Sequence, residues 1–441
     1  MSSASESRGG PTTVDEGVFR RFMRATELDT RLLGMIAALI VIWVGFQYFG
    51  WWRTGTGRFL TPENLYKLLV QTSSIAVMTT GMVLIIVMRH IDLSVGSVLG
   101  FVAVVMGFAQ IYWLNPALGI DNPWIWVCAL AIGLAVGASI GALHGYLIAY
   151  AGIPSFIVTL GGLIVWRAAA WKVIHGETVA PMDKTFELIG GGPFGSTLGG
   201  LASWGLGGVA CLAIVAGILS GRTARKRFGF PLRPIWAEIL LGSIGCVFTL
   251  GTVYVVNSYP WAPRIAENYA KANNIAMPEG GLVIPHGFAI PVLIAIAAGI
   301  VMTFIATRTS FGRYIYAIGG NPEAAELAGV NTRKITLLMF MLMGILVGIS
   351  ACITAARLDA ASNSLGQFDE LYVIAATVIG GTSLAGGVGT IYGAILGALV
   401  MQSLQSGMTL LNFDSAVKDV IVGSVLVFAV WIDQVYRRRQ A

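Results

Sequence analysis

The stretch from Leu371 to Leu411 reads LYVIAATVIGGTSLAGGVGTIYGAILGALVMQSLQSGMTLL and contains no charged residue. A helix needs about 20 apolar residues to cross the hydrocarbon core of a bilayer, so this stretch is too long for a single span. The glycine-rich sequence GGTSLAGGVG at Gly380 to Gly389 interrupts it. We therefore predict a membrane segment that divides into a short first helix and a full second one.

The rest of the chain has the same character. Its 441 residues are 56% hydrophobic and only 11% charged, a composition whose main solvent is lipid. The net charge of +6 is small for this length and lies in a few loops, which argues against a nucleic-acid partner. The four cysteines lie in apolar runs without the spacing of a disulfide framework or a metal site, so neither is predicted.

The sequence predicts an all-α polytopic membrane protein with about 12 transmembrane helices. Nine of these helices are expected to begin near Leu33, Leu65, Leu93, Trp124, Ile153, Trp204, Ala237, Gly287 and Ile335. The divided stretch adds two, and the last runs from about Val417 to Ile432. The transmembrane domain then covers residues 32–434, between an N-terminal tail at 1–31 and a basic C-terminal tail at 435–441.

Positive charge predicts that both termini are cytoplasmic. Lysine and arginine concentrate in cytoplasmic loops of membrane proteins, and an even number of spans keeps both ends on one side. The clusters that this orientation places inside are Arg20, Arg21, Arg24 and Arg31, the RTARKR run after Gly221, Arg308 with Arg313, and Arg437 to Arg439. We take residues 1–31 as a retained cytoplasmic tail, because no apolar leader segment is evident there.

Glycines recur every four residues in the fourth predicted span, at Gly133, Gly137, Gly141 and Gly145. A four-residue period places them on one helical face. Small residues on a shared face let helix backbones approach closely in a membrane. They predict a tight bundle and say nothing about its cargo.

A polar segment separates the eighth and ninth spans, within a predicted cytoplasmic loop at 308–334. It reads GRYIYAIGGNPEAAELAGVNTRK from Gly312 to Lys334. Asn321 is a suitable N-cap, Pro322 suits the first helical position, and Gly329 suits a C′ residue. The predicted helix of about two turns is too short to be stable without packing on a partner or on the bundle.

Three motifs carry a resemblance to a known family. The loop just quoted, HIDLSVGSVLG at His90 to Gly100 and IAATVIGGTSLAGGVGTIYGAILGAL at Ile374 to Leu399 resemble the permease subunits of bacterial sugar ABC importers of the ribose, galactose and xylose group. GIPSFIVTLGGLIVWRA at Gly152 to Ala168 is similar to a fourth region of that family. An extra helix pair at 204–257, with its basic linker, is most like the xylose-type permeases.

The resemblance implies an ATP-driven importer for a monosaccharide, such as the pentose D-xylose, in the bacterial cytoplasmic (inner) membrane. It implies a homodimer with a second copy of the chain, an ABC ATPase subunit and an extracytoplasmic sugar-binding protein. No GxxxxGK[ST] phosphate loop occurs, so ATP and Mg²⁺ are expected on the partner ATPase and no cofactor in this chain. Coupling to the ATPase is assigned to Gly312, Asn321, Glu323, Ala324, Ala325, Leu327, Ala328 and Gly329.

The sequence also bears on two other classes of protein. An ion-coupled secondary sugar transporter with six spans on each side of the basic linker stays as the alternative. Such transporters place carboxylates in a central cavity, whereas the Asp and Glu residues of this chain lie near the predicted ends of the spans. For an intramembrane enzyme, the sequence would need clustered catalytic residues or a metal-binding motif. It has neither, so no catalytic and no metal residue is predicted.

Polar residues inside the spans form the expected sugar path, since a neutral sugar needs hydroxyl, amide and aromatic groups. The residues are Thr72, Ser73, Thr79, Ser94, Ser97, His144, Ser155 and Thr159. Each hydroxyl also has the simpler role of bonding its own helix backbone. Asp359, Asp369 and Glu370 are expected to receive the binding protein, and snorkelling to headgroups accounts for Arg167.

Overall fold

The computed structural model describes residues 26–27, 30–192 and 195–438. Most of the predicted N-terminal tail at 1–31 and the end of the C-terminal tail at 435–441 lie outside these residues. The chain forms two compact units. The smaller unit is Trp204–Thr252 with the described residues up to Leu33, and the larger unit is Gly34–Ser203 with the chain from Val253 onward.

Helices make up almost all regular structure in the described chain. Their bounds are α2 (Thr30–Thr54), α3 (Pro62–Val87), α4 (Val95–Ala109), the π-helical turn η1 (Gln110–Leu114), α5 (Asn115–Leu118), α6 (Ile125–Ala149), α7 (Ser155–Ile174), α8 (Lys184–Glu187), the short turn η2 (Leu188–Gly190), α9 (Gly200–Arg227), α10 (Ile235–Asn257), α11 (Pro263–Ala272), α12 (Ile290–Arg308), α13 (Ser310–Gly320), α14 (Pro322–Leu327), α15 (Thr332–Leu358), α16 (Asp369–Ile379), α17 (Ile391–Leu410) and α18 (Ser415–Arg438).

Nine helical segments among the described residues are long and apolar enough to cross a membrane. They begin close to the nine predicted starts, at Leu32, Pro62, Val95, Ile125, Ser155, Gly200, Ile235, Ile290 and Thr332. The stretch Leu371 to Leu411 divides as predicted, into α16 with 11 residues and α17 with 20. The all-helical membrane class is therefore confirmed, and the number of spans rests on α16 to α18.

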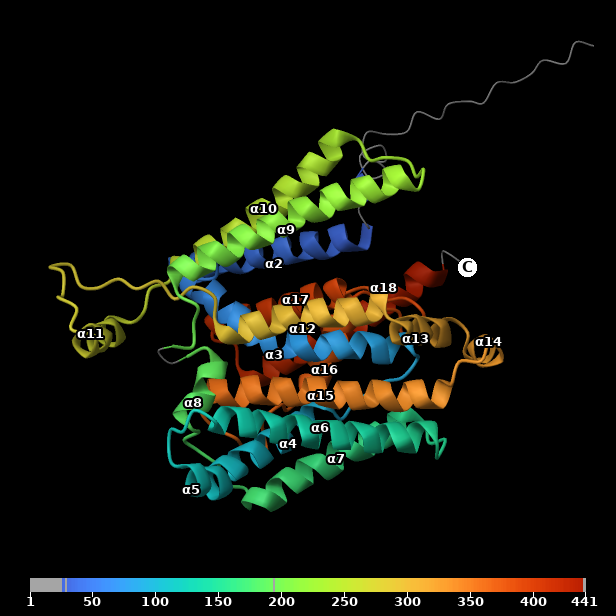
Figure 1. Cartoon of the computed structure of the whole chain (residues 1–441), viewed down its shortest axis with the longest axis horizontal. Coiled ribbons are helices and arrows are strands. Elements are labelled where there is room, and N and C mark those ends of the chain that lie inside the picture. The colour runs from blue at the N-terminus through green and yellow to red at the C-terminus, as the bar shows by residue number, and fades with distance from the viewer. Residues whose placement is uncertain (1–25, 28–29, 193–194, 439–441) are drawn as a thin grey trace, which may run out of the picture. The chain divides into compact units, whose positions relative to one another are not determined.

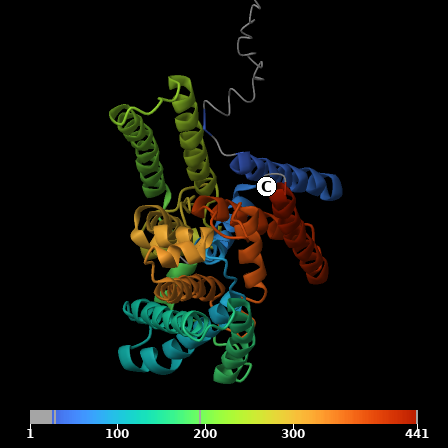
Figure 2. The same ribbon diagram turned by 90° about the vertical axis from the view of Figure 1, so that its right-hand side faces the viewer.

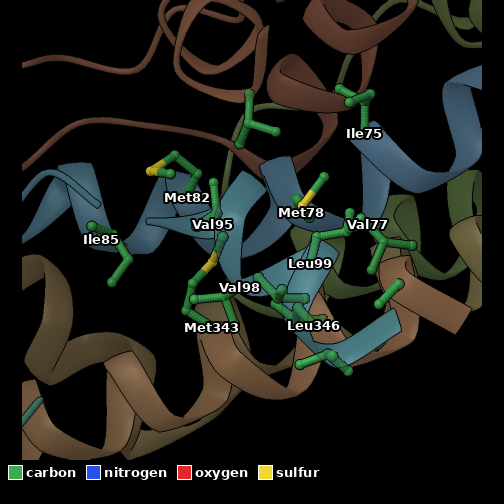
Figure 3. Close-up of a cluster of buried hydrophobic side chains, with 14 of the residues drawn as sticks. Ile75, Val77, Met78, Met82, Ile85, Val95, Val98, Leu99, Met343 and Leu346 are labelled. Atoms are coloured by element: carbon green, nitrogen blue, oxygen red, sulfur yellow. The ribbon is translucent and has the colours of Figure 1, made fainter. Parts of the chain in front are cut away.

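Helix α3 is the axis of the larger unit. Over its most apolar window 94% of the residues are buried, and it packs against α15, α17, α12 and α16. Both views show α15 lying between α3 and α6 (Figures 1 and 2). In Figure 3, Met78 and Met82 of α3 meet Val98 and Leu99 of α4 and Met343 of α15. These side chains are buried, so the middle of the bundle is a continuous apolar core.

The predicted glycine face of α6 packs directly on α15. A Cβ atom on Gly137 would overlap the carbonyl oxygen of Gly344, and one on Gly141 would overlap that of Phe340. Gly344 in turn leaves no room for a Cβ against the Gly137 carbonyl. The two backbones therefore touch without side chains between them, as the four-residue spacing predicts.

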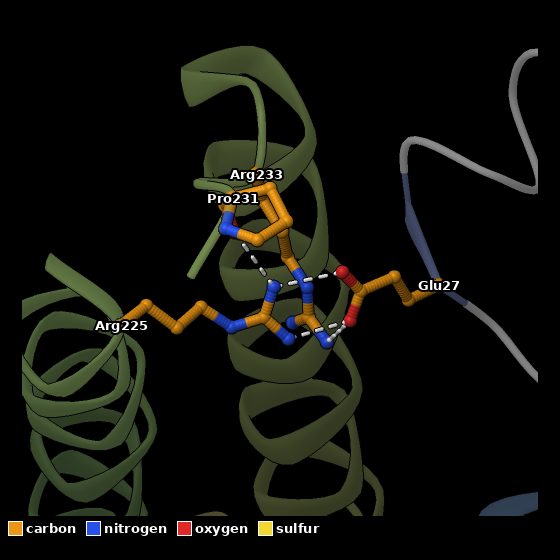
Figure 4. Close-up of polar contacts among 4 residues, drawn as sticks. All are labelled: Glu27, Arg225, Pro231 and Arg233. Carbon is orange, nitrogen blue, oxygen red and sulfur yellow. Dashed lines mark hydrogen bonds and ion pairs between the residues drawn. The ribbon is translucent and has the colours of Figure 1, made fainter. Parts of the chain in front are cut away.

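The smaller unit contains the extra helix pair α9 and α10. Arg222 near the end of α9 donates to Glu238 of α10 at 2.8 Å. Glu27 accepts from Arg225 at 2.6 Å and from Arg233 at 2.8 Å, as Figure 4 shows. These hydrogen bonds, that from Arg225 first, lower the pKa of Glu27 to about 2. The basic linker is thus partly neutralised by carboxylates of its own unit.

Replacing Gly137 with Ala is expected to lower the thermal stability of the purified protein. The added methyl group forces α6 and α15 apart, which costs about 1–3 kcal/mol. The matched control is Gly161→Ala in α7, where a Cβ meets no atom within 4 Å. A thermal-shift measurement in detergent checks this, and equal melting temperatures for the two variants would contradict the close packing.

Candidate functional site

Local capping forms α14 as the sequence predicts. The Asn321 side chain accepts a hydrogen bond from the Ala324 amide at 3.0 Å, and Pro322 occupies the first turn. Gly329 follows the helix with a φ of +82°, a left-handed conformation that glycine adopts without strain. Gly312 lies in the first turn of α13, where a Cβ would overlap the Ala306 carbonyl at the end of α12.

Only one side of α14 packs on the protein. Ala325 is buried, with 5% of its surface exposed, whereas Leu327 is 90% exposed. Ala324 and Ala328 are also exposed, and Glu323 lies beside them. The small apolar face predicted from sequence is therefore turned away from the bundle, where a partner can reach it.

The arginine that precedes the HIDLSVG motif fixes the helix before α14. Arg89 donates from Nε to the Gly319 carbonyl at 2.8 Å and from Nη2 to the Gly320 carbonyl at 2.7 Å. These carbonyls are at the end of α13, where a helix lacks backbone partners. A cation there also complements the negative end of the helix dipole.

The glycine-rich loop between α16 and α17 joins the same contact. The Gly387 amide donates to the Val87 carbonyl at 2.9 Å, and the Tyr316 hydroxyl donates to the Gly389 carbonyl at 2.7 Å. A Cβ on Gly319 would overlap the Val87 carbonyl, so the segments touch through their backbones. We call this cluster of Val87, Arg89, Gly319, Gly387 and Tyr316 with its bonded neighbours the coupling node.

Most hydroxyls predicted for a sugar path bond to their own helices. Thr72 donates to the Leu68 carbonyl at 2.6 Å, and Ser73 donates to that of Leu69 at 2.9 Å. Thr79, Ser97 and Thr159 make the same kind of backbone bond. Ser155 accepts from the Ile91 amide at 3.4 Å. Each of these donors thus bonds to a carbonyl of its own helix, which is the simpler of the two roles. Their role in a sugar path stays a prediction.

His144 belongs to a buried network that joins three helices. Its Nε2 accepts from the Trp166 indole at 3.0 Å, and its Nδ1 lies 3.4 Å from the Ser94 hydroxyl. Ser94 donates both its hydroxyl and its amide to Asp92. Because Nε2 is the acceptor, the ring is neutral with its proton on Nδ1. The network ties α6 and α7 to the start of α4.

A polar cavity of about 480 Å³ opens between α3, α15, α16 and α17, beside the end of α15 that lies opposite to α14. None of the predicted path residues lines it. Its wall is formed by Asn64, Lys67, Gln71, Ser74, Ile75, Thr354, Arg357, Asp369, Tyr372, Gln402, Gln405, Ser406, Thr409 and Leu410.

Hydrogen bonds between helices hold the cavity wall. Gln402 of α17 donates to Gln71 of α3 at 3.0 Å. Ser406 donates to Asn64 at 2.9 Å, which makes a second bond between the same two helices. Thr354 of α15 donates to the Ser74 hydroxyl at 2.8 Å. Side-chain amides and hydroxyls therefore line the space and join α3 to both neighbours.

The three acidic residues predicted to receive a binding protein lie in different surroundings. Asp359 accepts from the Met182 amide at 2.7 Å, and burial together with Asp359 raises the pKa of Glu187 to about 7. Asp369 lines the cavity. Glu370 is only 6% exposed and faces the position of Gly96. A docking role for the group stays a prediction.

The interpretation of Arg167 as a snorkelling residue is wrong. Its guanidinium turns inward and donates to the carbonyls of Asn363 at 2.6 Å and Leu365 at 2.7 Å. These carbonyls belong to the loop before α16 and have no helical partners. Arg167 therefore holds this loop against the bundle.

Sequence reasoning missed the cavity residues Gln71, Arg357, Gln402 and Gln405. Amide side chains and an arginine near the middle or the end of an apolar helix are costly in lipid, and that cost is a signal for an internal polar space. These polar residues are visible in the sequence, but the sequence does not show which helix faces meet. Arg89 was also missed, although it directly precedes a quoted motif.

Comparison with known proteins places the chain in a family. The family model described as branched-chain amino acid transport system / permease component matches residues 194–430, more than half of the chain. The chain belongs to this permease family. The match agrees with the resemblance predicted from the sequence motifs.

Curated relatives cover almost the whole permease. The "Xylose transport system permease protein XylH" of Haemophilus influenzae is 34% identical over 90% of this chain and 95% of its own length. The protein of that name from Escherichia coli K12 is 34% identical over 95% of each chain. The "Ribose import permease protein RbsC" of E. coli K12 is 30% identical over 94% of this chain and 96% of its own. No solved structure matches the permease.

Proposed function

We propose that the chain is the membrane-spanning subunit of an ATP-driven ABC importer for a monosaccharide. The observation that carries this proposal is the exposed face of α14, whose buried side is anchored through α13 to the coupling node. A short helix with an exposed Leu327 suits docking in a groove of a partner that changes the conformation of the bundle. Family membership as a transport permease favours this class over an enzyme.

The proposed cargo is a pentose, D-xylose in the first place. The proteins at 34% identity are named for xylose transport, and those named for ribose and L-arabinose are 30% and 29% identical. All three sugars are neutral pentoses, which suits a cavity lined by amides and hydroxyls. An extracytoplasmic binding protein would select the sugar and deliver it.

The proposed topology has twelve crossings with both termini in the cytoplasm. The start of α16 and the far end of α15 line one cavity, through Asp369 and Arg357, and the loop after α16 bonds to Val87 next to α13. Eleven helical residues cover only about 16 Å, so the extended loop completes this crossing. Helices α17 and α18 then provide the last two. This places α14 inside and the polar cavity toward the outside of the bacterial inner membrane.

The partners in this proposal are a second copy of the chain, an ABC ATPase and the sugar-binding protein. ATP and Mg²⁺ would be held by the ATPase alone. An ion-coupled transporter is the disfavoured alternative, because the family and the curated relatives are transport-system permeases and one relative is named as an ABC transporter permease.

Uptake is expected to require ATP on the side of the ATPase and no ion gradient. In sealed liposomes that contain the permease and its ATPase, loaded binding protein outside and ATP inside should give D-xylose accumulation that a protonophore does not reduce. Uptake that continues without the ATPase and collapses with the protonophore would favour the ion-coupled alternative.

Replacing Ala324 with Trp is expected to abolish coupling while the protein still reaches the membrane. The indole overfills the groove that receives the exposed face of α14 but meets no atom of the bundle's core. Stimulation of ATP hydrolysis by the loaded binding protein should fall at least about tenfold, as expected for a loss of 1.4 kcal/mol or more of binding.

Ala272→Trp is the matched control, since Ala272 is also exposed, at the end of the short helix α11. This variant should hydrolyse ATP and take up sugar normally. Normal coupling in Ala324→Trp would mean that α14 only connects α13 to α15.

A further inference from the structure

Two opposite charges face the polar cavity without a hydrogen-bond partner. Arg357, at the end of α15, and Asp369, at the start of α16, both line the space. In the part of the chain that the structure describes, no hydrogen bond or ion pair reaches either side chain, and only a longer-range attraction acts between them. Arg167, by contrast, donates to three carbonyls.

Arg357 and Asp369 are half-buried and have no hydrogen-bond partner among the described residues, so both side chains are available to a ligand in the cavity. A charge taken from water into a membrane protein is costly and is kept where it contacts a substrate, an ion or another charge. A guanidinium only donates hydrogen bonds and a carboxylate only accepts them. A hydroxyl group does both, so a molecule with several hydroxyls can bond to Arg357 and Asp369 together.

The rest of the wall selects a neutral ligand. Gln71, Gln405 and Thr409 offer amide and hydroxyl groups, and Tyr372 adds an aromatic ring. Lys67, the remaining charge, already pairs with Glu63 at 2.5 Å. An anion would meet Asp369 and a cation would meet Arg357, whereas a neutral polyol adds no charge to the pair. The volume of about 480 Å³ lies in the usual range of small-molecule sites.

A second cavity provides an approach to the first. It measures about 330 Å³ and shares Lys67, Gln71 and Arg357 in its wall. On its other side the rings of Tyr259 and His286 stack within 3° of parallel at 4.7 Å. Tyr66 packs against both rings. Flat aromatic faces suit the C–H face of a sugar ring, so Arg357 lies between an aromatic approach and a polar chamber.

The polar cavity is closed on the side that faces α14. Below Ile75, which lines the cavity, α3 continues into the buried residues Met78 and Met82. A sugar in the cavity therefore rests on the apolar core shown in Figure 3. Polar hydroxyls cannot enter that core until the helices separate.

We infer that this cavity is a monosaccharide-binding site within the permease, in which Asp369 accepts from and Arg357 donates to the sugar hydroxyls. The inference rests on the proposed function and adds a site to it. The sugar is held by the permease after its delivery, and the membrane subunit contributes to the choice of cargo. Other small neutral polyols share this chemistry.

The test compares Asp369→Asn and Arg357→Gln in the complete transporter in liposomes, with D-xylose as the probe. The readout is the number of sugar molecules taken up per ATP hydrolysed. We expect this ratio to fall about tenfold or more in each variant, since a hydrogen bond to a charged group is lost. Dividing uptake by the ATP hydrolysed separates a loss of sugar binding from a loss of ATPase activity.

The matched controls are Glu267→Gln and Lys184→Gln, which remove exposed charges outside both cavities. They should leave the ratio unchanged. Exchanging the two charges, with Arg357→Asp and Asp369→Arg together, should not restore uptake. Restored uptake would mean that Arg357 and Asp369 only attract each other and bind no sugar, which overturns the site.

Normal uptake in both single variants, while the unaltered transporter works, would overturn the site and leave the proposed function intact. An unaltered transporter that moves no sugar with ATP would overturn the proposed function and the site with it. If Asp369→Asn fails to reach the membrane, Asp369→Glu keeps the charge and moves its oxygens into the cavity. Its KM for D-xylose should rise, and an unchanged KM would count against the site.

Discussion

The Gly387 amide bonds to the Val87 carbonyl, and this contact joins the end of α3 to the loop after α16, two segments that are far apart in the sequence. It forms only because the backbones of α3, α13 and the loop after α16 touch. A side chain at Gly319 would separate them, since its Cβ would occupy the space of the Val87 carbonyl. Arg89 completes the contact by bonding to two carbonyls of α13. The coupling node therefore makes α13, α3 and the α16–α17 loop one mechanical element.

Movement at α14 can reach the polar cavity through this element. Helix α3 begins in the cavity wall with Asn64 and ends at the coupling node with Val87. The loop that bonds to Val87 also connects α16 to α17, which supply Asp369 and Gln402 to the same wall. Packed helices shift as rigid bodies between discrete arrangements, so we propose that a push on α13 would change the cavity at the other end. In this proposal the buried apolar core between them is the barrier to the sugar.

The spans and α14 were predictable from the sequence because their signals are local. Length and hydropathy marked nine segments close to their observed starts, and Asn321 and Gly329 marked the ends of α14. The glycine face of α6 followed from its four-residue period. The cavity did not follow, because Gln71, Arg357 and Asp369 come from three helices whose rotation no local pattern fixes. The serine and threonine residues do not distinguish a sugar path from a structural role, since their hydroxyls bond equally well to the backbone of their own helix.

The role of the coupling node is tested most directly by the accessibility of the cavity. A cysteine is placed at Thr409, which is exposed in the cavity wall, in a chain whose four native cysteines are replaced. The complete transporter is treated from the outside with a membrane-impermeant thiol reagent, with and without a non-hydrolysable ATP analogue at the ATPase. We expect nucleotide to change the labelling rate at position 409, and Arg89→Ala to remove this change while the ATPase still binds the permease. The same nucleotide-dependent change in the Arg89→Ala chain would contradict a role of the coupling node.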